Sequence, residues 1–303
     1  MARSAGATLV AMKVVIAGST GFIGSALADS LRADGHQVLG ISRTAAPDTV
    51  VWDLEARVMD SAALEGVDAV VNLAGETIDG RWTARKKRRL VDSRLGSTQV
   101  LADAIASLDA KPGVYVAGSA MGFYGSRGDE VLTESAAPGS DFLARLVIDW
   151  EAASRPIADL GVRVPLARTS LVLGADGGAF PRLRRITKLF AGGPLGSGRQ
   201  WMSWITLADQ VRAVRHLIDH EVEGPVNLAT PAPVQQREFA RTLGRVLGRP
   251  AVLPAPAFAI KLALGEMGES LLLGSTRLDP AVLAANGFEF GHPELEEAMR
   301  SIA

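Results

Sequence analysis

Short apolar runs alternate with longer segments of helical periodicity over the first 170 residues. The apolar runs predict strands at 13–17, 37–41, 50–52, 69–73, 114–117 and 163–167. Most of them are continuously apolar, which is typical of parallel strands buried on both faces. The segments between them predict helices over 22–33, 83–108 and 142–160. This alternation predicts an α/β fold with a Rossmann-type, doubly wound parallel sheet.

The pattern changes after residue 170. Glycine-rich loops at 174–178 and 192–198 precede predicted helices at 207–219, 237–247, 258–273 and 293–302. The sequence therefore predicts an N-terminal extension (1–11), a Rossmann domain (12–170) and a smaller, mostly helical C-terminal lobe (171–303, with its helical end from about 250). Ligands of such sheets bind beyond the carboxyl ends of the strands, so we expect the lobe to close a substrate site.

Composition excludes several classes of site. The 303 residues include no cysteine, which removes disulfides, thiolate metal sites and a cysteine nucleophile, and fits a reducing, cytoplasmic setting. His216 and His220 are four residues apart but lack a metal-site motif, so we expect an ordinary surface pair and no metal. The net charge is −1 and no apolar run is long enough to span a bilayer. We expect a monomer or homodimer with a small-molecule substrate and no nucleic-acid or membrane partner.

A glycine-rich turn joins the first predicted strand to the first helix. In this context, glycines let the backbone approach a pyrophosphate, while the helix N-terminus offers N–H groups and a positive dipole end. A tight turn without a ligand is the alternative. The predicted cofactor-binding residues here are Gly18, Ser19, Thr20, Gly21, Phe22, Ile23 and Gly24.

The end of the second strand bears on cofactor choice. An NAD site usually has an acidic residue there, which binds the ribose 2′-hydroxyl. This chain has Ser42 and Arg43, and an arginine can pair with a 2′-phosphate. The pattern favours NADP(H), with a surface arginine as the alternative. Asp53 is expected to reach the adenine edge or to form a turn.

Several longer motifs occur together. GSTGFIG, VVNLAGE and GSAMGFYG are accompanied by SRLGST, DWE, RTSLVLGADGGAF and GGPLGSGRQWMSWI. Together they resemble the extended short-chain dehydrogenases/reductases, and in particular their atypical group of epimerase family proteins. The resemblance runs from about residue 13 to residue 302. The small residues after the fourth strand let the chain pass close to the cofactor ribose. The predicted cofactor-binding residues there and on the following helix are Leu73, Ala74, Gly75, Glu76 and Arg94.

The resemblance also implies an active site that this chain lacks in part. Typical members use a Ser or Thr with a Tyr-x-x-x-Lys helix, in which tyrosine transfers protons and lysine binds ribose. Leu143 and Val147 stand at the tyrosine and lysine positions. Ser119 matches the Ser/Thr, and Tyr124 is the nearest substitute acid. The alternative is that Tyr124 only packs and hydrogen-bonds.

Other polar residues are expected near the substrate, namely Arg81, Arg168, Arg199 and Trp201. Arginine beside aromatic residues in a glycine loop suits an anionic or sugar-bearing ligand. We therefore expect an oxidoreductase or epimerase-like enzyme acting on a small carbonyl or sugar-like substrate. The competing hypothesis is a non-catalytic, redox-sensing or regulatory NADP(H)-binding protein.

Overall fold

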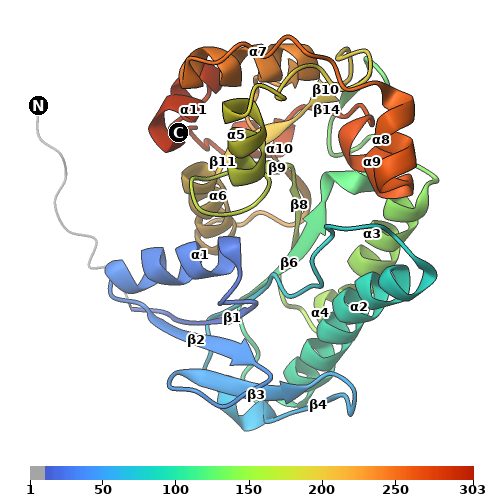
Figure 1. Cartoon of the computed structure of the whole chain (residues 1–303). Helices are drawn as coiled ribbons and strands as arrows, with labels where there is room; N and C mark the ends of the chain where they lie inside the picture. The colour runs from blue at the N-terminus through green and yellow to red at the C-terminus, as the bar shows by residue number, and fades with distance from the viewer. Residues whose placement is uncertain (1–10) are drawn as a thin grey trace, which may run out of the picture.

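The computed structural model describes residues 11–303. The predicted N-terminal extension therefore lies, except for its last residue, outside the described part. A large sheet of eight strands forms the centre of the molecule (Figure 1). In spatial order its strands are β12 (Gly224–Leu228), β8 (Pro165–Thr169), β6 (Val114–Ala120), β5 (Ala69–Asn72), β1 (Lys13–Ala17), β2 (Gln37–Ser42), β3 (Thr49–Asp53) and β4 (Val58–Met59).

All neighbouring strands of this sheet are parallel except β3 and β4, which form an antiparallel pair. The strand order places β1 at the centre, with later strands added outward on both sides. The predicted Rossmann-type sheet is thereby confirmed.

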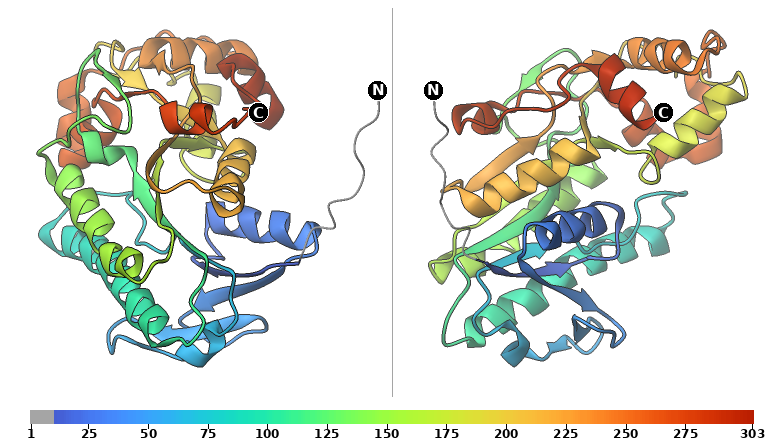
Figure 2. Two further views of the ribbon diagram at one scale, coloured as in Figure 1. Left: turned by 180° about the vertical axis from the view of Figure 1, so that it is seen from behind. Right: turned by 90° about the vertical axis from the view of Figure 1, so that its left-hand side faces the viewer.

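Helices cover both faces of the sheet because its strands alternate their side chains between two apolar clusters. Val14 and Ile16 face α1 (Phe22–Ala33) and α6 (Leu207–Asp219), which lie side by side (Figure 2). Val15 and Ala17 face α2 (Ala84–Ser107) and α4 (Arg155–Asp159). The inner strands β1, β5 and β6 are thus buried on both sides, as their unbroken apolar runs predicted.

The lobe lies over the carboxyl ends of the central strands (Figure 1). Its core gathers Phe180, Trp204, Phe239 and Leu295, and Trp204 is fully buried. The remaining elements are η1 (Ser61–Leu64), η2 (Met121–Tyr124), β7 (Val131–Leu132), α3 (Phe142–Ala152), β9 (Leu171–Leu173), α5 (Phe180–Lys188), β10 (Trp201–Met202), β11 (Trp204–Thr206), β13 (Val234–Gln235), α7 (Gln236–Leu247), α8 (Ala257–Leu264), α9 (Glu266–Leu272), β14 (Arg277–Leu278), α10 (Ala281–Ala285) and α11 (Leu295–Ile302).

The chain crosses between sheet and lobe more than once. The boundary predicted at residue 170 separates β8 from its neighbour β12, although the two pair in parallel from Gly224 to Leu228. A parallel pair needs a crossover, and α6 supplies it. Residues 171–206 thus enter the lobe, and α6 and β12 return to the sheet. The chain after β12 goes back to the lobe, except that α10 packs against β12.

Two predicted helices are broken. The helix expected over 142–160 ends at Ala152 and resumes as α4, in which Pro156 occupies the first turn. Proline in the middle of a longer helix would lose a backbone hydrogen bond and clash with the preceding turn. The helix expected over 258–273 breaks at Gly265, which has φ of +62°. The sequence reading also missed α5 and α10.

Asp209 anchors the C-terminal segment to the sheet domain. Its side chain is buried at the start of α6 and accepts hydrogen bonds from the backbone N–H groups of Gly291 at 2.8 Å and His292 at 2.9 Å. We predict that Asp209→Ala lowers the free energy of unfolding by about 2–4 kcal/mol, because two backbone donors lose a buried, charged acceptor. Urea unfolding followed by circular dichroism measures the change.

Asp219→Ala, on an exposed part of the same helix, is the matched control and should change stability by less than about 0.5 kcal/mol. Equal effects of the two substitutions would contradict the anchoring role of Asp209.

Candidate functional site

The turn between β1 and α1 can be built only from glycine at two points. Gly18 has φ of +86°, and a side-chain carbon there would lie 2.9 Å from the backbone of Leu73. A side-chain carbon at Gly24 would lie 2.1 Å from the carbonyl oxygen of Gly18. Both contacts are too close for any other residue, so the turn is held tightly against the end of β5.

The N-terminus of α1 has no partner of its own among the described residues. Gly21 is its N-cap, no side chain caps it, and its first turn contains no acidic residue. Thr20 and Gly21 are exposed. The free N–H groups and the positive end of the helix dipole are therefore available to an anion such as a pyrophosphate. The residues present fit a dinucleotide.

Three side chains of the turn point into the protein. The ring of Phe22 packs on the loop at 174–178, and a side-chain carbon at Gly177 would lie 2.2 Å from it. Ile23 joins the core beside α6. Ser19 lies against Gly40 of β2. These residues therefore shape the turn, and only their backbone atoms remain for a ligand.

Of the two residues predicted at the end of β2, only Arg43 extends into solvent. It is exposed and makes no hydrogen bond or ion pair within residues 11–303. Ser42 accepts a hydrogen bond from the backbone N–H of Thr44 at 3.1 Å. Arg43 is thus an exposed cation just after β2, the strand that pairs with β1. The NADP(H) hypothesis requires a cation at this place.

Asp53 takes part in a turn. Its Oδ1 accepts hydrogen bonds from the N–H groups of Glu55 at 2.9 Å and Ala56 at 3.0 Å, between the antiparallel β3 and β4. The turn alternative thus accounts for this carboxylate, and its predicted contact with adenine is not needed to explain it.

Side chains of α2 hold the loop that follows β5 in place. Leu73 and Ala74 lie against Gly18, as the cofactor prediction required. Glu76 forms an ion pair with Lys86 at 2.7 Å, and the hydrogen bond from Lys86 lowers the pKa of the Glu76 carboxyl. The loop is therefore held by charge as well as by packing.

Arg94 lies beneath Gly75 in the same loop. Its Nη1 donates to the carbonyl oxygens of Glu76 and Leu90, each at 3.2 Å, and its guanidinium lies 5.2 Å from the ring of Trp150. Burial lowers the pKa of Arg94 to about 10. Arg94 remains protonated at neutral pH, and no carboxylate hydrogen-bonds to it within the described chain. It is a desolvated positive charge under the predicted ribose contact.

A buried polar network lies at the carboxyl ends of β6 and β8. Ser119 donates a hydrogen bond to Oε1 of Glu151 at 2.5 Å. Arg168 binds the same carboxylate in a bidentate manner, through Nε at 2.8 Å and Nη2 at 2.9 Å. Burial alone would lower the pKa of Arg168, but the hydrogen bond and charge of Glu151 outweigh it and raise that pKa.

Tyr124 belongs to this network and is fully buried. Its hydroxyl donates to Oδ1 of Asn227 at 2.7 Å and accepts from Nη1 of Arg168 at 2.9 Å. Burial raises the pKa of the Tyr124 hydroxyl, although the hydrogen bond and charge of Arg168 oppose the shift. With its proton committed and no exposed surface, Tyr124 packs and hydrogen-bonds, which is the alternative to the predicted acid.

Arg168, for which we predicted contact with the substrate, is buried in the same way, and that role stays a prediction. Only 3 % of this residue is exposed, and its donors are spent on Glu151, Tyr124 and the carbonyl oxygen of Glu134. Ser119, with 5 % exposed, is the one predicted catalytic residue placed at a strand end with a carboxylate partner.

Sequence reasoning did not predict Glu151 as part of the site. The signal was its spacing, because Leu143, Val147 and Glu151 stand four residues apart on one face of α3. A side-chain carbon at Gly122 would lie 3.3 Å from Leu143 and 3.8 Å from Val147. An apolar face that ends in a buried carboxylate indicates a partner across the site, which proves to be Arg168.

The remaining predicted substrate residues lie around the lobe. Trp201 donates from Nε1 to Asp129 at 2.8 Å, and the guanidinium of Arg277 lies 4.2 Å from its ring. Arg199 is exposed, and Arg81 is exposed near Gly265. None of these three side chains hydrogen-bonds to the network of Ser119, so the structure leaves their predicted role open.

The described chain contains no group of three or more His, Asp or Glu side chains that could hold a metal ion. The rings of His216 and His220 stack at 3.9 Å. No helix within residues 11–303 is long and apolar enough to cross a membrane.

Comparison with known proteins extends the likeness over the whole chain. Residues 14–229 match the model of the NAD dependent epimerase/dehydratase family, and residues 255–302 match a domain of unknown function (DUF1731). An epimerase family protein of Mycobacterium tuberculosis is 44% identical over 290 residues, which cover 94% of this chain and 96% of that protein. The human epimerase family protein SDR39U1 is 35% identical, with 96% and 99% covered.

Two solved structures are similar to this chain, each with 33% sequence identity. A crystal structure of human SDR39U1 with NADPH has a TM-score of 0.88 at 33% identity and covers 96% of this chain and 99% of that one. A nucleoside-diphosphate sugar epimerase of Corynebacterium glutamicum has a TM-score of 0.80 at 33% identity. It is covered over 58% of its length, against 97% of this chain.

We predict that Tyr124→Phe destabilises the protein by about 1–3 kcal/mol without weakening NADPH binding. The substitution leaves Oδ1 of Asn227 buried without a donor but touches nothing at the glycine turn. Urea unfolding and calorimetric titration with NADPH measure the two effects. An unchanged stability combined with a lost ligand response would show that Tyr124 is not structural.

Proposed function

The chain belongs to the NAD-dependent epimerase/dehydratase family, and from this premise we propose that it is an NADP(H)-dependent oxidoreductase or epimerase-like enzyme. Its substrate would be a small carbonyl or sugar-like molecule. The proposal rests above all on the hydrogen bond between Ser119 and Glu151 at the carboxyl end of β6, where ligands of parallel sheets bind.

Four parts of this chain would hold the cofactor. The N–H groups at the start of α1 would bind the pyrophosphate, and Arg43 would pair with a 2′-phosphate. The turn at Leu73–Ala74 would lie against a ribose, with the charge of Arg94 beneath it. The human relative was solved with NADPH, which supports the same preference here.

Ser119 and Glu151 would manage the proton. In the direction of oxidation, a substrate hydroxyl gives its proton to Oγ of Ser119 while the proton of Ser119 passes to Oε1 of Glu151. In the direction of reduction, each proton moves the opposite way. When bound, the cofactor accepts or supplies the hydride. Arg168 keeps the carboxylate oriented toward Ser119 through its two hydrogen bonds.

A second candidate is a non-catalytic, redox-sensing or regulatory NADP(H)-binding protein. The packing of Leu143 and Val147 under Gly122 favours it, because neither side chain can transfer a proton or bind a ribose. The buried hydroxyl of Tyr124 offers no substitute. The two candidates share the cofactor site and differ only in turnover.

We predict that Arg43→Ala weakens NADPH binding by roughly 10- to 100-fold and leaves NADH binding unchanged, because only NADPH carries the 2′-phosphate. Calorimetric titration with both cofactors measures the effect. Arg85→Ala, an exposed arginine on α2, is the matched control and should alter neither affinity. A wild-type preference for NADH would refute the role of Arg43.

We further predict that Ser119→Ala lowers turnover at least about 100-fold while NADPH affinity stays within about twofold, since the proton path is lost and the cofactor contacts are not. NADPH oxidation would be followed with small aldehydes, ketones and nucleoside-diphosphate sugars. Glu151→Gln should lower turnover similarly, and circular dichroism checks that the variant is folded. Wild-type binding of NADPH with no turnover on any of these compounds would favour the regulatory candidate.

A further inference from the structure

One face of the lobe is strongly basic although the whole chain has a net charge of −1. The segments 180–190 and 241–262 contain eight Lys and Arg and no Asp or Glu. Arg245 and Lys261 pair with glutamates outside these segments. The other six make no ion pair within the described residues; they are Arg182, Arg184, Arg185, Lys188, Arg241 and Arg249.

The same two segments expose large apolar side chains. Six of the ten exposed large hydrophobic residues of the described chain belong to them: Leu189, Phe190, Val252, Leu253, Phe258 and Leu262. Exposed apolar side chains scattered singly need no explanation, whereas a local concentration indicates an interaction surface.

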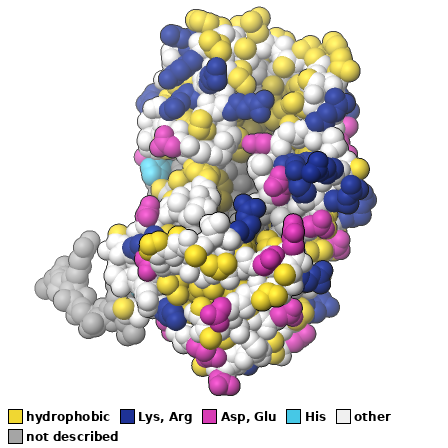
Figure 3. Space-filling view, turned by 60° about the horizontal axis from the view of Figure 1, so that its bottom comes forward, with side chains coloured by type: hydrophobic (Ala, Val, Ile, Leu, Met, Phe, Trp, Pro, Cys, Tyr) yellow, Lys and Arg dark blue, Asp and Glu magenta, His cyan; other side chains and the backbone are white. Residues whose placement is uncertain are grey.

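The fold brings the two segments together. Helices α5 and α7 pack through Phe180, Leu183, Phe239 and Leu243, so their basic residues are left on the outside. The guanidinium of Arg249 lies 5.4 Å from the ring of Phe190. Lys and Arg side chains lie beside hydrophobic ones over the upper part of the molecule (Figure 3).

Phe190 is held in an unusual backbone conformation. It has φ of +64° and stands just beyond the end of α5, a place where glycine is favoured. The residue remains 52 % exposed, so packing against the protein does not account for the strain. A strained, exposed aromatic residue at a helix end is a reason to look for a function.

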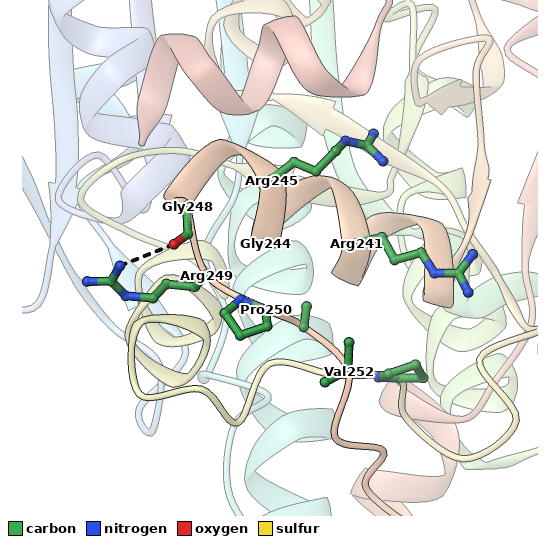
Figure 4. A pocket seen from close by; sticks show the side chains of 9 residues that line it. Arg241, Gly244, Arg245, Gly248, Arg249, Pro250 and Val252 are labelled. Atoms are coloured by element: carbon green, nitrogen blue, oxygen red, sulfur yellow. Dashed lines mark hydrogen bonds between the residues drawn. The ribbon is translucent and has the colours of Figure 1, made fainter.

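A cavity of about 580 Å³ opens on the part of this face that α7 and the chain after it form. Arg241 and Arg245 line it from α7, and Arg249, Pro250 and Val252 line it from the chain that follows this helix (Figure 4). Arg241 and Arg249 diverge around it, which suits several negative groups spread over a surface better than one small enclosed anion.

We propose that this basic apolar face docks on an anionic lipid bilayer. Leu189, Phe190, Val252 and Leu253 would enter the boundary between headgroups and acyl chains, and Arg182, Arg185, Lys188, Arg241 and Arg249 would contact lipid phosphates. Exposed apolar side chains ringed by unpaired cations are the pattern of peripheral membrane binding. The proposal departs from the expectation of no membrane partner, which was drawn from the net charge of the whole chain. The fold gathers unpaired cations on one face, although acidic residues elsewhere balance them in the net charge.

The test is co-sedimentation of the full chain with vesicles of phosphatidylcholine alone and with equimolar phosphatidylserine. We expect binding only to the anionic vesicles, weakening as salt is added. Arg241→Glu with Arg249→Glu should lower the partition coefficient at least about tenfold, and Leu189→Ser with Phe190→Ser should do the same. All four residues are exposed, and thermal unfolding checks that the variants remain folded.

Matched controls lie on other faces. Arg85→Glu with Arg88→Glu makes the same charge change on α2, and Val58→Ser with Val131→Ser removes equally exposed apolar groups. Both should bind as wild type does. Equal losses in these controls, equal binding to neutral vesicles, or no binding to anionic ones would overturn the proposal. So would concentration-dependent self-association through this face without vesicle binding.

Discussion

The bidentate pair between Arg168 and Glu151 holds together parts of the chain that are distant in sequence. Arg168 comes from β8 and Glu151 from α3. Glu151 also accepts a hydrogen bond from Ser119 at the end of β6, and Arg168 also donates one to Tyr124 in the turn that follows. Two charges removed from water are tolerated only when each is paired and fully hydrogen-bonded, so this geometry constrains all four residues at once.

The same constraint accounts for how α3 packs in this chain. In typical members of the family resembled, a tyrosine and a lysine project from the helix that here is α3. In this chain Leu143 and Val147 fill those positions and pack under Gly122, while the one polar residue of that face, Glu151, turns toward Ser119. The polar contact in this region therefore joins Glu151, near the end of α3, to Ser119, at the end of β6.

The conformation of the glycine turn between β1 and α1 depends more on steric contacts than on charge. Gly18 and Gly24 leave no room for a side chain, and the turn they form rests on the backbone after β5. Beneath that loop Arg94 supplies a desolvated cation, and beyond β2 Arg43 supplies a solvated one. The basic face of α5 and α7 is made of other residues, so the docking that we propose and the proposed cofactor contacts involve separate parts of the chain.

The sequence by itself determined most strands of the large sheet, several of the helices and the glycine turn. Unbroken apolar runs fixed the buried strands, and β1, α1 and α6 match their predicted bounds, because burial and helical periodicity are written in consecutive residues. Only the tertiary structure decided that β12 joins the sheet, that Tyr124 is buried against Asn227, and that Glu151 meets Arg168. These facts depend on contacts between distant residues, and no local pattern specifies which distant partner a polar side chain will find.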